Sequence, residues 1–93
     1  MSLTVHVPSA LREHTGGRAT IDVPEPGDTV ASALEALFAL HPGLRDRLVT
    51  ERFQLRPHVA VFLGTESIRD SGGLDSPIGD DAELTIVPAV SGG

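Results

Sequence analysis

Two glycines, Gly92 and Gly93, end this 93-residue chain, and their position is the first feature that suggests chemistry. The α-carboxylate of Gly93 is ionised at neutral pH and is therefore a poor electrophile. Reaction with ATP would convert it to an acyl-adenylate, which carries a good leaving group. Because glycine has no side chain, the pair can pass through a narrow channel and adopt dihedral angles closed to other residues. We therefore predict that Gly93 is the reactive residue and that Gly92 gives it access to the ATP site of a partner.

Other residue types that commonly do chemistry are not grouped in this sequence. Ser71 precedes two glycines, but no G-x-S-x-G stands between a strand and a helix, so it does not resemble a hydrolase nucleophile. Acidic residues cluster in predicted turns, where their side chains cap backbone amides, at Asp70, Asp75, Asp80 and Asp81. The histidines show no metal-ligand spacing, and we expect no metal site; they are His6, His14, His41 and His58.

The composition narrows the class of partner. Thirteen acidic residues against seven arginines give a net charge of −6, which disfavours nucleic acid and anionic membranes and favours basic grooves on proteins. No apolar run approaches the roughly 18 residues of a membrane span, and the first residues do not form a signal-peptide pattern. Cysteine is absent, which excludes disulfides and suits the cytoplasm. Lysine is absent as well, so the only primary amine is the N-terminus.

The first quarter of the chain predicts a β-hairpin. Apolar residues alternate over residues 3–7 and 19–23, and the connection between them closes on Gly16 and Gly17. The alternation places four side chains on one face of the hairpin: Val5, Val7, Ile21 and Val23.

A helix is predicted next. Asp28 or Thr29 can cap its first turn, and Pro42 ends it, because the residue before proline avoids helical dihedral angles. Residues 44–48 predict another short helical turn. The apolar stripe of the main helix is Val30, Ala33, Leu34, Leu37 and Phe38.

Three more strands are predicted, over residues 59–63, 67–69 and 83–87. Residues 49–57 and 71–77 are interpreted as loops, and Pro88 marks the end of the last strand.

This order, hairpin then helix then three strands, indicates an α+β protein with the β-grasp, or ubiquitin-like, fold: a mixed sheet of about five strands over one main helix. We predict that residues 1–88 form this domain and that residues 89–93 form a flexible tail ending in Gly92 and Gly93. Two terminal glycines occur by chance in roughly 0.5–1% of chains, but a β-grasp domain whose last strand leads into them makes the ending specific.

Alternation within the strands also predicts a docking surface. If Val59 and Val61 face the helix, Phe62 faces outward, and the same parity exposes Val87 near the tail. A register shift of one residue would reverse every side chain, and a loop over Phe62 would cover it. Arg56 and Arg69 could border the patch. The predicted partner-binding residues are Phe62, Val87, Pro88, Ala89, Val90 and Ser91.

Several stretches resemble the MoaD/ThiS family of ubiquitin-like sulfur carriers, and within it the CysO-type carriers of actinobacterial cysteine biosynthesis. The terminal motif is the most specific, and Ser91 departs from the alanine expected in a CysO-type ending. The resembling stretches are Leu11-Arg12 with residues 14–17, residues 27–29, Arg69 with residues 71–74, and residues 85–90 before the two glycines.

The resemblance implies a carrier rather than an enzyme. An E1-like adenylyltransferase would activate the Gly93 carboxylate with ATP, and a sulfurtransferase would replace AMP by sulfur to give a thiocarboxylate at Gly93. No intrinsically bound cofactor is implied. In CysO-type systems the thiocarboxylate attacks an activated serine on a pyridoxal-phosphate-dependent synthase, and a metalloprotease later releases cysteine.

Other functions stay open at this point. Within the same class they are the small subunit of molybdopterin synthase and a sulfur donor for a specialised metabolite. From other classes they are a ubiquitin-like protein modifier and an interaction domain whose glycine tail is inert.

Overall fold

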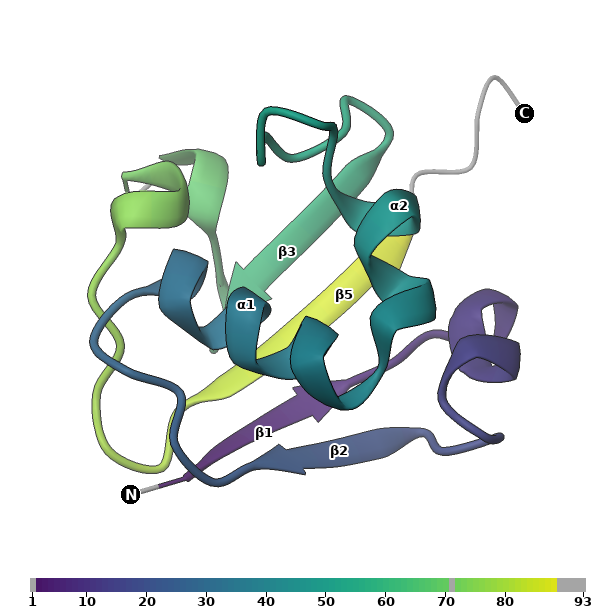
Figure 1. The fold of residues 1–93 in the computed structure, drawn as a ribbon. Helices are drawn as coiled ribbons and strands as arrows, with labels where there is room; N and C mark the ends of the chain where they lie inside the picture. Colours follow the sequence, from purple (N-terminus) through teal and green to yellow (C-terminus); the bar gives the residue numbers. More distant parts are fainter. Residues whose placement is uncertain (1, 71, 89–93) are drawn as a thin grey trace.

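The computed structural model describes residues 2–70 and 72–88 and shows one five-stranded mixed sheet with helix α1 (Val30–Leu40) packed across one face (Figure 1). The strand order is β2-β1-β5-β3-β4. The parallel pair β1 and β5 lies at the centre, and the other neighbours are antiparallel. This is the predicted β-grasp fold. The strands are β1 (Leu3–His6), β2 (Thr20–Val23), β3 (Val59–Leu63), β4 (Glu66–Ser67) and β5 (Glu83–Pro88).

The apolar side chains of the N-terminal hairpin lie on one face, as predicted. Val5 lies opposite Ile21, and the four side chains assigned to one face are all buried. The connection is longer than a tight turn, because a 3₁₀ helix (Ser9–His14) precedes the two glycines. Gly16 and Gly17 have φ angles of 67° and 86°, which other residues rarely adopt.

Helix α1 begins with a capping box. The hydroxyl of Thr29 accepts a hydrogen bond from the Ser32 amide at 3.2 Å, and the hydroxyl of Ser32 accepts one from the Thr29 amide at 3.1 Å. Of the two predicted cap candidates, Thr29 is therefore the N-cap. The helix ends at Leu40, before Pro42, and its five predicted stripe residues are all buried.

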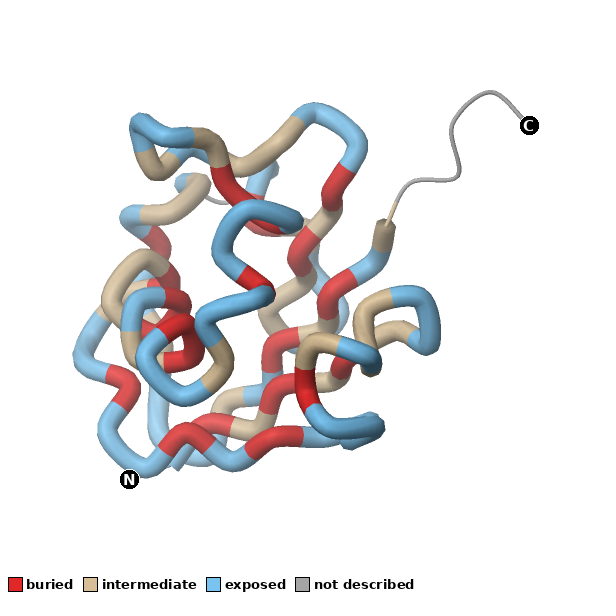
Figure 2. The backbone as a smooth tube through the Cα atoms, turned by 45° about the vertical axis from the view of Figure 1, so that its right-hand side comes forward, coloured by how far each residue is buried: buried red, intermediate tan, exposed pale blue. Residues whose placement is uncertain are grey.

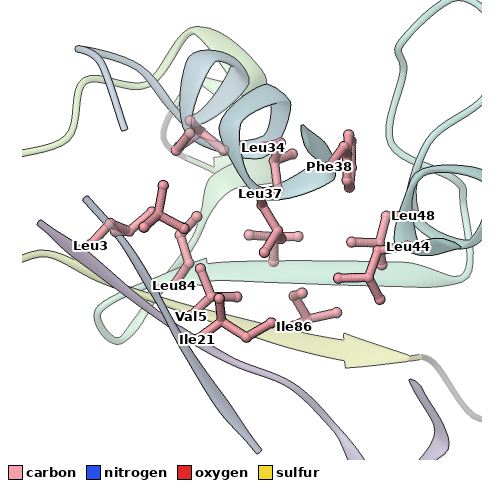
Figure 3. Packing of buried hydrophobic residues seen from close by; sticks show 14 of the residues in the cluster. Leu3, Val5, Ile21, Leu34, Leu37, Phe38, Leu44, Leu48, Leu84 and Ile86 are labelled. Carbon is pink, nitrogen blue, oxygen red and sulfur yellow. The ribbon is translucent and has the colours of Figure 1, made fainter. Parts of the chain in front are cut away.

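The core lies between α1 and the sheet and is closed at one end by the short helix α2 (Arg45–Leu48) (Figure 3). A 3₁₀ turn (Pro42–Leu44) leads into α2, and Leu44 and Leu48 are fully buried beneath it. The predicted helical turn over residues 44–48 is thus confirmed.

Several boundaries differ from the prediction. Strand β1 ends at His6 and β2 begins at Thr20, each one residue inside the predicted segment. The strand expected over residues 67–69 ends at Ser67, and Ile68–Asp70 forms a 3₁₀ helix. Ile68 is fully buried, and the chain must turn here from the sheet edge toward α1, which a continued strand could not do. A further 3₁₀ helix (Gly73–Asp75) lies in the expected loop. Strand β5 runs one residue further than expected, to Pro88, which lies opposite Val59.

The described helices are short. The longest, α1, has 11 residues, and no helix in residues 2–70 and 72–88 has the length and apolar character needed to span a membrane.

Candidate functional site

The predicted reactive residues, Gly92 and Gly93, lie outside the described residues, as do Ala89, Val90 and Ser91. The described residues do show the strand that precedes this segment, which is β5. Strand β5 lies between β1 and β3, and its Leu84 and Ile86 side chains are buried in the core. Residues 89–93 therefore follow directly from the most firmly held strand of the sheet.

The outer face of the sheet carries the predicted docking residues. Figure 2 shows buried and more exposed residues alternating along the strands. The inward-facing side chains of β3 and β5 include Val61 and Ile86, which lie opposite each other and are buried. Phe62 pairs with Thr85, so Phe62 and Val87 are diagonal neighbours on the opposite face.

The two docking residues differ in exposure. Val87 is 40% exposed, as expected from the alternation of side chains along the strand. Phe62 is only half-buried, lying between its cross-strand partners Thr85 and Ser67. The orientation of both side chains agrees with the prediction, and their role in binding stays a prediction.

A polar contact on the same face was not predicted. Nε2 of His6 and Oε1 of Glu83 are 2.6 Å apart. His6 lies opposite Thr85, so His6, Thr85 and Phe62 form one row across β1, β5 and β3. The two partners are 77 positions apart in the chain, and a single sequence carries no signal that pairs them.

The two arginines expected to border the patch, Arg56 and Arg69, make hydrogen bonds around the start of β3, and their role at the patch stays a prediction. The Arg69 guanidinium donates hydrogen bonds to the backbone carbonyls of Arg56 and Val59, each at 2.8 Å. Nε of Arg56 donates to the carbonyl of Asp46 at 2.7 Å. These bonds tie α2 and the loop before β3 to the place where β5 ends.

The site offers little chemistry of its own. Within the described ranges, no three His, Cys, Asp or Glu side chains come together in a group that could hold a metal ion. What the described residues provide is a last strand that is paired on both sides and a partly apolar outer face of the sheet that includes Phe62 and Val87.

A five-stranded mixed sheet over one helix, with its central strand leading into a Gly-Gly ending, defines a ubiquitin-like protein. The model of the ThiS family matches residues 5–93, and the chain belongs to that family.

Similar proteins agree with this assignment. The chain is 37% identical to the sulfur carrier protein CysO of Mycobacterium tuberculosis over 95 residues, covering 100% of both chains. It is 38% identical over 84 residues to small archaeal modifier protein 1 of Haloferax volcanii, covering 89% of this chain and 91% of that one. A crystal structure of the BexX/CysO complex of Amycolatopsis orientalis contains a chain with a TM-score of 0.89 and 38% identity, covering 98% of this chain and 99% of that one. The protein is accordingly a sulfur carrier, and the cysteine type is favoured.

Proposed function

We propose that the Gly93 carboxylate is the atom group on which this protein carries sulfur. An E1-like adenylyltransferase transfers AMP from ATP to the carboxylate and releases pyrophosphate. A sulfurtransferase then supplies sulfur at the oxidation level of sulfide: the sulfur attacks the acyl carbon, the bond between that carbon and the AMP oxygen breaks, and AMP leaves a thiocarboxylate at Gly93. The observation that carries this proposal is the full-length similarity to sulfur carriers in a chain whose central strand leads to Gly92 and Gly93.

The proposal divides the chain into a docking body, residues 1–88, and a reactive tail, residues 89–93. Five extended residues span up to about 17 Å, which is enough to enter an active site while the body stays outside. Gly92 keeps the end of the tail narrow. The chemistry belongs to the partners, and the protein acts as their co-substrate without a cofactor of its own.

Docking has to offset the cost of ordering the tail, which is about 1–2 kcal/mol of backbone entropy per residue. Phe62 and Val87 support this part of the proposal because they share the outer face of the sheet: Val87 lies next to the last residue of β5, and Phe62 is its diagonal neighbour, opposite Thr85. We assign the docking surface to them together with Pro88, Ala89, Val90 and Ser91.

Downstream, the thiocarboxylate donates its sulfur in the cytoplasm to a cysteine-type synthase that uses pyridoxal phosphate, and a metalloprotease releases the product. The full-length similarity to CysO supports this pathway. Ser91 is small enough for the channel that the CysO-type ending requires.

The test is pyrophosphate exchange catalysed by the E1-like enzyme of the same organism. The wild-type chain should support ATP-dependent exchange, and Gly93→Ala should reduce it at least tenfold without unfolding the domain, at about 1.4 kcal/mol per factor of ten. Gly79→Ala is the matched control, because a Cβ there meets no atom within 4 Å and the residue does not have a positive φ. Normal exchange by Gly93→Ala would contradict the proposal.

The similarity to an archaeal modifier protein favours one second candidate, covalent attachment of Gly93 to lysines of other proteins. This chain contains no lysine, so such attachment could not build chains of the protein on itself except through its N-terminus. Higher-mass conjugates in cell extracts, lost on Gly93 deletion, would support the modifier. If the extracts contain no such conjugates but do contain the free protein with a thiocarboxylate, the result would support the sulfur-carrier function.

A further inference from the structure

All seven arginines gather at one end of the molecule, the end at which β1 and β5 stop (the arginine end). Antiparallel pairing makes β2 and β3 begin at this same end. Helix α2 is held there, because the Arg56 amide donates to the Leu48 carbonyl at 3.0 Å (Figure 1). The arginines lie in the β1–β2 connection, in α2, in the loop before β3 and after β4, at Arg12, Arg18, Arg45, Arg47, Arg52, Arg56 and Arg69.

The opposite end is acidic. Glu83 begins β5 beside Thr4, and Glu66 lies opposite Leu63 where β3 ends. The loops at this end, residues 24–29, 64–66 and 76–83, contain no arginine. Their six acidic residues are Glu25, Asp28, Glu66, Asp80, Asp81 and Glu83. The net charge of −6 is therefore unevenly distributed: the segments of the arginine end also carry Glu13, Asp46, Glu51 and Asp70, but the seven arginines outnumber these four. The basic partner groove expected from the net charge alone does not suit this end of the molecule.

The arginines are not neutralised within the molecule. Within residues 2–70 and 72–88, the one ion-pair contact joins His6 to Glu83 and involves no arginine. Three arginines donate to backbone carbonyls instead, and the Arg45 guanidinium lies 5.3 Å from the centre of the Phe53 ring. These contacts position four guanidinium groups, those of Arg12, Arg45, Arg56 and Arg69, and do not neutralise their charge.

Three of the seven arginines line neighbouring hollows and form a border near the end of β5. Arg47 and Arg56, with Asp46 and His58, line a surface hollow of about 310 Å³. Arg52 and Arg56, with Glu51, line a neighbouring one of about 410 Å³, so arginines outnumber carboxylates in both. The border adjoins the end of β5, because Arg69 bridges the carbonyls of Arg56 and Val59, and Val59 lies opposite Pro88. We call Arg47, Arg52 and Arg56 the arginine rim.

We propose that the arginine rim docks onto carboxylates of the activating enzyme around the entrance to its ATP site. This inference rests on the proposed function. Guanidinium groups match carboxylates with paired hydrogen bonds, and arginine is enriched at protein interfaces. The acidic end would be repelled by the same surface, so the charge distribution turns the tail toward the entrance during approach. The six acidic residues of the acidic end and the net charge of −6 disfavour binding to a nucleic-acid backbone, so an acidic protein surface is the favoured occupant.

The test compares charge reversals at exposed arginines by pyrophosphate exchange with the same E1-like enzyme, at about 0.05 M and about 0.5 M salt. Arg47→Glu and Arg52→Glu change the rim. Arg18→Glu is the control, because it makes the same charge change beside β2, at the far side of the sheet from β3. The rim variants should raise the KM for the carrier about five- to tenfold at low salt, with kcat changed less than about twofold. The increase should shrink at high salt, and Arg18→Glu should stay within about twofold at both.

Equal KM increases for the rim and control variants, or increases that do not depend on salt concentration, would contradict docking through the arginine rim. Either result would leave the proposed function intact. Rim-dependent binding of a duplex RNA that competes with the enzyme would also overturn it. Absence of both exchange and complex formation with the wild-type chain would contradict the proposed function and the rim together. Circular dichroism of each variant establishes that the fold is retained.

Discussion

Val59 and Pro88 lie opposite each other across β3 and β5, so the last described residue of the chain is paired with the first residue of a neighbouring strand. The Val59 carbonyl also accepts a hydrogen bond from Arg69 at 2.8 Å. The tail therefore starts from a point held by the sheet and by a side chain from beyond β4. A fixed starting point limits where Gly93 can reach once the body has docked.

Removing the Arg69 contact should weaken this anchor. Arg69→Ala loses two hydrogen bonds from a charged donor to backbone carbonyls, and we expect a loss of about 1–2 kcal/mol in the free energy of unfolding, measured by urea denaturation. Arg52→Ala is the control, since its exposed side chain has no hydrogen bond in the described structure, and it should change stability by less than about 0.5 kcal/mol. Equal losses in the two variants would show that the contact adds nothing.

The capping box of α1 should contribute measurably to stability. Thr29→Ala removes the acceptor for the Ser32 amide, and the expected cost is about 1 kcal/mol in the free energy of unfolding. Thr65→Ala, in the exposed turn after β3, provides the comparison and should have little effect. A thermal or urea midpoint for Thr29→Ala equal to that of Thr65→Ala would argue against the cap.

Substituting two leucines of α1 by alanine distinguishes the contribution of core burial to stability from that of helix propensity. Leu37 is fully buried and Leu40 is 51% exposed, so both substitutions by alanine change the same helix but only one opens the core. Leu37→Ala should cost about 2–5 kcal/mol and Leu40→Ala less than about 0.5 kcal/mol in urea denaturation. A large loss on Leu40→Ala would mean that its exposed position is covered in solution.

Docking through the outer face predicts a contrast between two exposed apolar residues. Val87→Asp places a charge beside the start of the tail and should raise the KM for adenylation about tenfold, equivalent to about 1.4 kcal/mol of lost binding. Leu40→Asp makes the same change on the helix side, away from this face, and should leave the KM within about twofold. If both variants are activated like the wild type, the assignment of the docking face is wrong.

The parts of the fold that depend on local sequence were predictable. Alternation fixed the facing of Val5 and Ile21, and the 3.6-residue period identified the buried stripe of α1. The β-grasp fold was assigned from the order of hairpin, helix and strands together with analogy, and the structure has this fold, with strand order β2-β1-β5-β3-β4.

The parts that depend on tertiary contacts were not predictable. Ile68 ends β4 early because it enters the core, which the local β-propensity does not reveal. The contact between His6 and Glu83 joins strands 77 positions apart. The clustering of the arginines also emerges only once β1, β3 and β5 are placed, since those residues range from Arg12 to Arg69 in the chain. The reactive role of Gly92 and Gly93 stays a prediction, because both residues lie outside the described part of the chain.

The most direct test of the central claim is the intact mass of the protein purified from its native cells under sulfur-replete growth, followed by fragmentation of the C-terminal peptide. We predict a population in which one oxygen is replaced by sulfur, with the change located at Gly93 and absent after deletion of Gly93. A protein that is wholly unmodified when its activating enzyme is present, or that carries its modification elsewhere, would contradict the account.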